Sequence, residues 1–299
     1  MKKTLLCYRG SVEAWEIDHM GHMNVQFYLK KAMHAVRIFF LKVGISYSES
    51  INYNSVFSLD SSHLRYLKEQ KAGAPIYIEA SIHSLSKNSF SIALIMKELL
   101  SKEPCASFLL SYKLNRNMNE SLLSKLKKCH LRFGMKMPTY GMPRGLASPK
   151  VTTKASIEVA DKIGMKETFL GVARGEYVDE DGLIGPENYM SIISNAVPNI
   201  LSNALSTVDK SRFGGAALEY AFDYKSFGSL GTPLIVRSGL IDLGNKTFTW
   251  LHWIFDVKTN ELLLEAKAVV IALDLKERKS IEIPITMHRT LSNILLKTI

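Results

Sequence analysis

The residues best suited to chemistry lie close together near the start of the chain, in the run from Ile17 to Asn24. Within it, Asp18, His22 and Asn24 supply a carboxylate, an imidazole and an amide, and Gly21 lies between the first two. A carboxylate or an imidazole can act as a general base or a nucleophile, and an amide can position water or cap a helix. The run is therefore a candidate acid–base site at a turn that leads into a helix.

A degraded copy of this run occurs 161 residues later, where Asp18 corresponds to Asp179 and Gly21 to Gly182. Other pairs keep this offset or, after a loop of different length, an offset of 158: Tyr28 and Tyr189, Ala35 and Ala196, Val36 and Val197, Tyr66 and Tyr224, Gly73 and Gly231, Pro75 and Pro233, Phe90 and Phe248. A period this long is too coarse for a solenoid. It predicts two copies of one domain of roughly 120 residues.

The two copies differ at the candidate site. The position of His22 is occupied by Leu183 in the second copy, and that of Asn24 by Gly185. We therefore expect one competent site per chain, formed by the first copy and lined by the second half. An alternative is that Asp179 or Asp181 provides a second catalytic carboxylate.

Each copy has the pattern of a strand, a long helix and several further strands. After a first strand at about 8–17, apolar residues recur every three or four positions from Val25 to Val43, which is one face of a helix, and Gly44 suits its end. The second helix begins at Pro186, a residue favoured in the first helical turn. Strand-like runs follow at about 56–67, 75–86, 89–100 and 104–114, then at 217–227, 233–243, 246–257 and 261–274. This order predicts an α+β fold in which the antiparallel sheet of each half wraps one long central helix.

Composition narrows the class of protein. A hydrophobic fraction of 46% and an aromatic fraction of 9% exclude a disordered chain. No apolar run approaches the roughly 18 residues of a membrane-spanning helix, and the apolar stretch at the start is too short for a signal peptide, so we expect a cytoplasmic protein with no membrane partner. Three widely spaced cysteines support neither a zinc site nor a disulfide framework, and we expect no metal.

The net charge of +10 raises the question of an anionic partner. Many basic residues fall between the two copies, in a segment that also holds several prolines and glycines: Lys125, Lys127, Lys128, Arg132, Lys136, Arg144 and Lys150. We predict domains at 1–115 and 153–299, joined by a basic linker at 116–152. This linker is either a solvated connector or a contact for a phosphorylated ligand. No nucleic acid is expected, because neither a phosphate loop nor an aromatic RNA-binding signature accompanies the charge.

The pattern of a strand, Asp-x-x-Gly-His-Met-Asn, an aromatic residue, a long helix and a sheet resembles the hotdog-fold acyl thioesterases of the 4-hydroxybenzoyl-CoA thioesterase type. The later run Tyr66–Glu69, with Gly73 before a strand, is also similar to that family. The resemblance covers about 8–115 and 172–275, in the tandem (double) hotdog arrangement of plant and bacterial acyl-ACP thioesterases. Their motif resembles Asp-x-Asn-x-His-x-Asn, whereas this chain has Met20 at the first Asn position. The Asp-x-Asn-Pro-x-x-His pattern of hotdog hydratases is absent.

The resemblance implies hydrolysis of an acyl thioester without a cofactor, with acyl-CoA or an acyl-carrier protein as substrate and acyl-CoA favoured. Asp18 would activate water or attack the carbonyl directly, His22 would orient the carbonyl or share the proton, and Asn24 would position water. The helix N-terminus would supply donors for the oxyanion. Three further residues are expected to bind substrate: Gly21, Met23 and Tyr28.

Several alternatives remain at this point. Asp18 could only stabilise the turn, His22 could be structural, and Asn24 could be a plain helix cap. His63 and His252 are interpreted as packing residues, and Glu219 could face the other half. A non-catalytic acyl-CoA or acyl-carrier binding protein is the competing function. Both a monomer and a homo-oligomer of such pseudo-dimers are compatible with the sequence.

Overall fold

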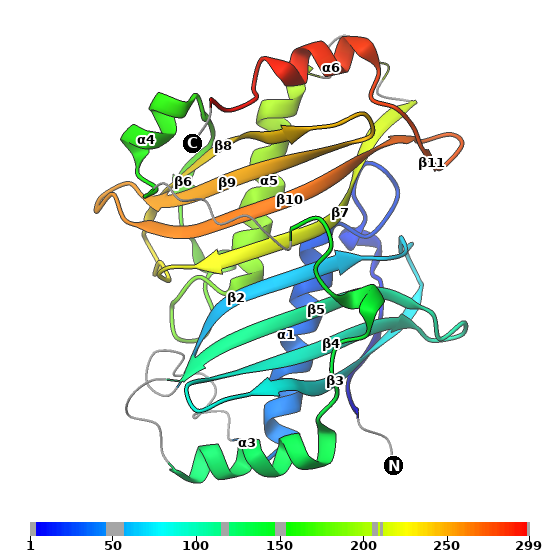
Figure 1. Cartoon of the computed structure of the whole chain (residues 1–299), viewed down its shortest axis with the longest axis vertical. Coiled ribbons are helices and arrows are strands. Elements are labelled where there is room, and N and C mark those ends of the chain that lie inside the picture. Colours follow the sequence, from blue (N-terminus) through cyan, green and yellow to red (C-terminus); the bar gives the residue numbers. More distant parts are fainter. Residues whose placement is uncertain are drawn as a thin grey trace. The chain divides into compact units, whose positions relative to one another are not determined.

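The computed structural model describes residues 4–45, 57–114, 120–146, 154–204, 209 and 212–297. The chain divides into two compact units, Met1–Pro143 and Arg144–Ile299. In each unit a sheet lies over one long helix, as Figure 1 shows. The two units are called unit 1 and unit 2 below.

Unit 1 is built around helix α1 (Val25–Lys42), which packs against three strands of its sheet. Neighbouring strands are antiparallel, in the order β1-β3-β4-β5-β2. The strands are β1 (Leu5–Ser11), β2 (Phe57–Tyr66), β3 (Pro75–Leu85), β4 (Ser89–Glu98) and β5 (Pro104–Leu114). The expected first strand at about 8–17 ends early, at Ser11, because the 3-10 turn η1 (Ala14–Glu16) interrupts it.

The core of unit 1 lies between α1 and the sheet. The apolar stripe expected from the sequence is buried, with Leu29, Val36 and Phe39 fully shielded from solvent. At the far end of the helix, Phe40 contacts an aromatic cluster in which the rings of Phe90 and Tyr112 stack at 4.9 Å. Burial of such side chains is the main stabilising contribution to the unit, at about 1.5–3 kcal/mol for each large apolar residue.

Unit 2 repeats this plan with helix α5 (Pro186–Ala204) and the strand order β7-β10-β9-β8-β6. Its strands are β6 (Lys166–Val172), β7 (Phe213–Tyr224), β8 (Pro233–Leu243), β9 (Thr247–Asp256) and β10 (Leu262–Asp274), and the short β11 (Lys279–Ser280) pairs with β10. The 3-10 turn η3 (Gly175–Tyr177) corresponds to η1. An additional helix, α4 (Ile157–Ile163), is capped by Ser156 and packs on an apolar cluster around Trp253.

The strand registers of the two units match. Ser11 pairs with Pro75 in unit 1, and Val172 pairs with Pro233 in unit 2. The hairpins close in the same way, with Leu85 opposite Phe90 and Leu243 opposite Phe248. The expected α+β fold of two hotdog halves is therefore confirmed, and the repeated residues hold equivalent positions.

The repeat extends into the segment for which the sequence predicts a linker. Helix α3 (Glu120–Phe133) packs on β3, because Leu122, Leu126 and Cys129 bury one of its faces. It is followed by the 3-10 turn η2 (Thr139–Gly141). The chain after α3 bridges Ile82, and the chain after α6 (Ile285–Ser292) bridges Leu240, the equivalent residue. Helices α3 and α6 are thus equivalents. Residues 115–119 and 147–153 lie outside the described ranges.

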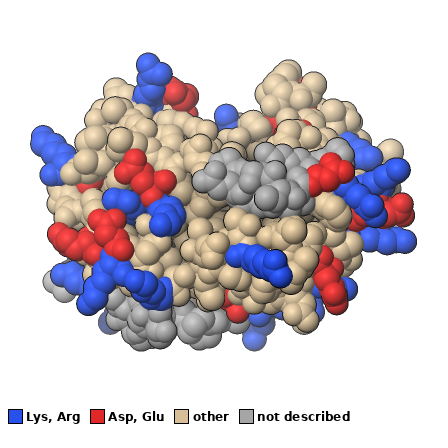
Figure 2. All heavy atoms as spheres, turned by 90° about the horizontal axis from the view of Figure 1, so that it is seen from above, with Lys and Arg blue, Asp and Glu red and all other residues tan. Residues whose placement is uncertain are grey.

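The surface carries charges of both signs. On the face shown in Figure 2, basic and acidic side chains lie next to one another. Among the described helices, none is long and apolar enough to cross a membrane.

Candidate functional site

A tight turn fixes the carboxylate of Asp18. The Asp18 N–H donates to the His22 carbonyl, and the Gly21 N–H donates to the Asp18 carbonyl, both at 3.0 Å. The Asp18 Oδ1 atom accepts the Met20 N–H at 2.9 Å. Gly21 adopts a φ of 81°, which favours glycine because it has no Cβ. One carboxylate oxygen is therefore held by the turn, and the other is left for a second partner.

The turn is attached to its surroundings on both sides. The Asn24 N–H donates to the Glu16 carbonyl at 2.8 Å, and the Met23 N–H donates to the Gln70 carbonyl at 2.7 Å. The Glu16 side chain forms a buried ion pair with Lys31 of α1 at 2.8 Å. Because a buried charge without a partner is costly, this pair fixes the segment before the motif relative to the helix after it. No periodicity in the sequence identifies this pair, and it was not predicted.

His22 lies between two carboxylates. Its Nδ1 atom is 3.4 Å from Asp18 Oδ2, and its Nε2 atom is 3.9 Å from Glu69 Oε1. The side chains of Asp18 and His22 are mostly buried, whereas that of Glu69 is more exposed. Within the described residues, His22 Nε2 has no hydrogen-bond partner. Glu69 belongs to the run that carries the family resemblance, but no role was predicted for it from the sequence.

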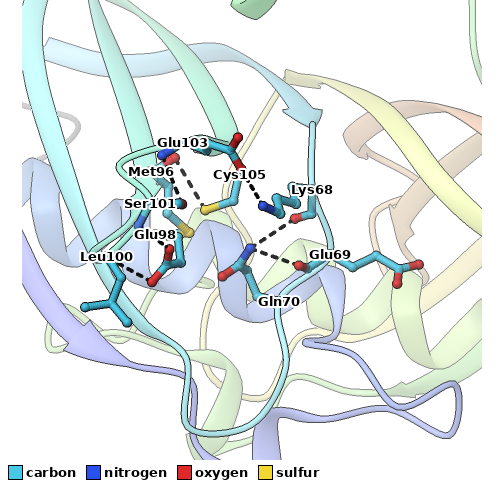
Figure 3. A network of polar contacts seen from close by, with 9 residues as sticks. All are labelled: Lys68, Glu69, Gln70, Met96, Glu98, Leu100, Ser101, Glu103 and Cys105. Carbon is cyan, nitrogen blue, oxygen red and sulfur yellow. Dashed lines mark hydrogen bonds and ion pairs between the residues drawn. The ribbon is translucent and has the colours of Figure 1, made fainter.

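The loop that carries Glu69 is anchored by its neighbours. The N–H groups of Leu67 and Lys68 both donate to the Cys105 carbonyl, at 2.9 and 3.2 Å. The Gln70 Nε2 atom donates to the Glu69 carbonyl at 2.9 Å, and Lys68 pairs with Glu103. Figure 3 shows that the Glu69 side chain points away from the Lys68–Glu103 pair. These contacts hold the loop in place and leave the Glu69 carboxylate directed elsewhere.

The start of α1 provides backbone donors beside these side chains. Asn24 caps the helix, since its Oδ1 atom accepts the Gln26 N–H at 3.1 Å. Most N–H groups from Asp18 to Phe27 are engaged in the turn, the cap or the helix. Among the described residues of this segment, the backbone N–H groups of His19, His22 and Val25 have no acceptor. Those of His22 and Val25 lie in the sequence on either side of the Met23–Asn24 pair that leads into the helix. Such donors at a helix N-terminus, where the dipole is positive, can stabilise a developing oxyanion.

Two of the residues expected to bind substrate lie beneath the turn. Met23 and Tyr28 are almost fully buried, and the Tyr28 ring packs edge-on against Tyr66 at 5.1 Å. Burial raises the pKa of the Tyr28 hydroxyl far above its usual range, so this group stays neutral. Gly21, in contrast, is exposed. Contacts of Gly21, Met23 and Tyr28 with substrate remain predictions.

The equivalent turn in unit 2 keeps the backbone and changes the donors. Gly182 has a φ of 73°, and the Asp181 N–H donates to Asp179 Oδ1 at 3.0 Å, as in unit 1. The Leu183 N–H, however, also donates to Asp179 Oδ1, at 3.2 Å. At the position of Val25, Pro186 has no N–H. The N–H groups of His22 and Val25, which lack an acceptor in unit 1, are therefore engaged or absent at the equivalent positions of unit 2.

The residues interpreted as packing residues are located in strands. His252 of β9 is fully buried and contacts the Ser238 hydroxyl at 2.8 Å through Nδ1. Burial lowers the pKa of His252 to about 3. His63 lies in β2 and is also buried. Glu219 of β7 is buried and accepts the backbone N–H groups of Arg144, Gly145 and Leu146, which anchors the first residues of unit 2.

Comparison with known families agrees with this geometry. The family model of the thioesterase-like superfamily matches residues 12–111 and 173–291, which covers both copies of the repeat. The chain belongs to this superfamily. Membership of the thioesterase-like superfamily supports hydrolysis of acyl thioesters as the activity. No curated protein sequence matches the chain significantly.

Solved structures show the same fold over most of the chain. An acyl-ACP thioesterase from Bacteroides thetaiotaomicron is 9% identical, with a TM-score of 0.63, over 90% of this chain and 98% of that one. A putative oleoyl thioesterase from Lactobacillus plantarum is 10% identical, with a TM-score of 0.66, over 90% and 96%. The 12:0-ACP thioesterase from Umbellularia californica is 9% identical, with a TM-score of 0.69, over 90% and 94%. At these identities the likeness is one of fold.

Proposed function

We propose that this protein hydrolyses acyl thioesters at the site formed in unit 1 by Asp18, His22 and the N-terminus of α1. The observation that carries the proposal is that one turn and the first residue of α1 bring together a carboxylate, an imidazole and the N–H groups of His22 and Val25, which have no acceptor among the described residues. Unit 2 repeats the turn without the imidazole and without these donors. This difference argues for a chemical role, because the turn itself forms in unit 2 without them.

The chemistry of the step follows from these groups. Water attacks the thioester carbonyl carbon while Asp18 Oδ2 takes its proton, and the negative charge that develops on the carbonyl oxygen is stabilised by the N–H groups of His22 and Val25. The carbon–sulfur bond then breaks, and the proton passes to the thiolate, which gives a free acid and a thiol. In the alternative route, the Asp18 carboxylate attacks the carbonyl itself and releases the thiolate, and water then hydrolyses the resulting anhydride.

We assign His22 and Glu69 a role in proton transfer. Asp18 Oδ2, which accepts the proton of water, lies beside His22 Nδ1. On the other side of the imidazole ring, Glu69 Oε1 is 3.9 Å from His22 Nε2. One bridging water, or a small movement of the exposed Glu69 side chain, would complete a hydrogen bond across this gap. Asn24 is assigned a positioning role, because its side chain fixes the start of the helix that carries the donors.

The carrier of the acyl group is part of the proposal. The sequence favours acyl-CoA, whereas two of the similar solved structures are named as acyl-ACP thioesterases. A basic protein can attract the phosphates of CoA and the acidic surface of a carrier protein alike. Both kinds of substrate therefore belong in the test.

The experiment is to measure thiol release from acyl-CoAs and acyl-carrier proteins with short, long and aromatic acyl groups. We expect turnover of at least one substrate by the wild-type protein and its loss in Asp18→Asn, with the same melting temperature for both. Binding of every substrate class without turnover would reject hydrolysis in favour of the non-catalytic acyl-binding function. Equal turnover by wild type and Asp18→Asn would show that the reaction takes place elsewhere.

A further inference from the structure

The net charge is distributed unequally between the two units. Residues 1–143 hold 20 Lys and Arg against 10 Asp and Glu, whereas residues 144–299 hold 18 of each. The entire excess of +10 therefore belongs to unit 1, which also carries the proposed site. Because charge distribution governs association with other molecules more than it governs the fold, this asymmetry indicates an anionic partner for unit 1.

Helix α3 concentrates this charge on one exposed face. The face consists of Lys127, Lys128, Leu131, Arg132 and, just beyond the helix, Lys136, and is called the α3 face below. Its four cations form no ion pair with any carboxylate in the part of the chain that the structure describes. Leu131 is 87% exposed in the middle of them. Arg132 lies over the Phe133 ring at 5.0 Å, and the three lysines are exposed. A single exposed leucine is ordinary on a protein surface, so it is the cluster of cations around Leu131 that suits a contact surface.

The fold does not require these residues. Helix α6 is the equivalent of α3 in unit 2. In both units the chain just after the helix forms a parallel β-bridge to the sheet, at Ile82 in unit 1 and at Leu240 in unit 2. Helix α6 has Arg289 as its only Lys or Arg residue. The buried side of α3, formed by Leu122, Leu126 and Cys129, accounts for its packing on β3. The basic face is therefore additional to what holds the helix in place.

We propose that the α3 face is the docking surface for an acidic protein that presents a carboxylate-rich helical face with a small apolar spot opposite Leu131. Resting on the proposed function, this partner is the protein that delivers the acyl thioester. Charge complementarity would speed encounter and fix the register, and Leu131 would provide the apolar centre of the contact.

Other anionic partners fit this surface less well. A membrane-binding helix inserts its apolar side into lipid, but the apolar side of α3 is buried on β3. Single-stranded RNA needs exposed aromatic side chains on which its bases stack, whereas Phe133, the aromatic neighbour of Arg132 on α3, is half-buried and lies under the Arg132 guanidinium. CoA is bound best in a concave site, whereas these cations project from the outside of one helix. A broad protein surface matches the arrangement.

The test measures binding of an acyl-carrier protein, used as the acidic probe, to Asp18→Asn, so that binding is measured without turnover. The docking variant combines Lys127→Gln, Lys128→Gln and Arg132→Gln. The control combines Lys30→Gln, Lys87→Gln and Lys102→Gln, which removes the same charge from exposed positions elsewhere in unit 1. We expect the dissociation constant to rise at least tenfold in the docking variant and less than threefold in the control. Leu131→Ser should weaken binding while leaving its salt dependence unchanged.

Three results would overturn the proposal. The first is that carrier-protein binding is weakened equally in the docking variant and the control. The second is that the carrier protein binds neither of them. The third is that the docking variant loses binding only to anionic vesicles or RNA. Hydrolysis of acyl-CoA by the docking variant in the wild-type background is measured separately. Because it does not require docking, unchanged acyl-CoA turnover with lost carrier binding supports the proposal. Absence of turnover by the wild type would reject the proposed function and leave the binding result valid.

Discussion

The turns before α1 and α5 have nearly the same backbone and different chemistry. Both place an aspartate four residues before the position of His22, with a glycine of positive φ between, and both fix one carboxylate oxygen through a backbone N–H. In unit 1 the carboxylate also faces an imidazole, and the nearby N–H groups of His22 and Val25 have no acceptor in the part of the chain that the structure describes. In unit 2 a leucine and a proline replace the residues that provide these features. The comparison teaches that the turn is a structural device and that its side chains and spare donors decide whether it can react.

The largest expected effect separates the two aspartates. Asp18→Asn should reduce kcat/KM by about 10³-fold, because the amide cannot accept a proton or attack a carbonyl. Asp179→Asn should change it less than threefold, since that carboxylate is engaged by the Asp181 and Leu183 N–H groups. Steady-state thiol release from the best substrate measures both. A large loss in Asp179→Asn would instead support a second catalytic carboxylate in unit 2.

The second prediction concerns one backbone donor. Val25→Pro gives unit 1 the residue that unit 2 has at this position and removes a single N–H. We expect kcat to fall about 10²-fold, as for the loss of one oxyanion donor. Folding should tolerate the change, because proline suits the first helical turn and Asn24 before it is already extended, with φ −63° and ψ 142°.

Val25→Ala is the matched control for this prediction, since it shortens the side chain and keeps the N–H. It should retain most of the activity. Pro186→Val restores the donor in unit 2 and should leave turnover unchanged, because no imidazole accompanies it there. Equal activity of Val25→Pro and Val25→Ala, with equal melting temperatures, would exclude the Val25 N–H as an oxyanion donor.

A smaller effect is expected for the carboxylate on the other side of His22. Glu69→Gln should reduce kcat about tenfold, the size of one charged hydrogen bond. Because Glu69 acts through the imidazole, the variant should also shift the pH profile of kcat, whereas KM should stay nearly constant. Glu103→Gln is the control, because it removes the ion pair that Glu103 forms with Lys68 of the same loop and does not reach His22. An unchanged pH profile in Glu69→Gln would indicate that Glu69 only supports the loop.

The smallest effect on activity, and a clear one on stability, is expected in the core of unit 2. Burial lowers the pKa of His252 to about 3, below its ordinary value of about 6.5 in the unfolded chain. The unfolded state therefore binds more protons between these values. The stability that His252 confers is fully present above about pH 6.5 and is lost as the pH falls toward 3.

His252→Leu gives unit 2 the residue that unit 1 has at the equivalent position, Leu94. Denaturant unfolding from pH 7 to pH 4 should lose stability less steeply in this variant than in the wild type. At pH 7 the variant should lose about 1 kcal/mol, because the Ser238 hydroxyl loses a partner. Parallel pH curves for the two proteins would show that His252 does not control the acid response.

Much of the fold could be predicted from the sequence, because the elements are encoded by local patterns. The helix stripe from Val25 and the strand-like runs lie within a few residues of the observed elements. The early end of β1 was not predicted, because the turn at Ala14–Glu16 depends on a capping box and on contacts with the motif. Helix α3 was not predicted, because prolines and glycines just after it have the composition of a linker.

The candidate site was predicted only in part. Asp18, His22 and Asn24 were identified from their types and spacing, and the structure brings Asp18 and His22 together while Asn24 caps α1. Glu69 and the Glu16–Lys31 pair were missed, since each depends on contacts across a large sequence separation. Such contacts follow from how the loop after β2 and the helix pack against the turn, and no local pattern records them.

The sequence by itself determined the duplication, the order of elements in each half and the loss of His22 and Asn24 in the second copy, because these are properties of residue types and their spacing. Only the tertiary structure decided which backbone donors keep no acceptor, which carboxylate lies beside His22 and which face of α3 stays exposed. The physical reason is that hydrogen bonding and burial are completed between segments. A residue's chemical role therefore depends on which of its groups the folded chain has already engaged.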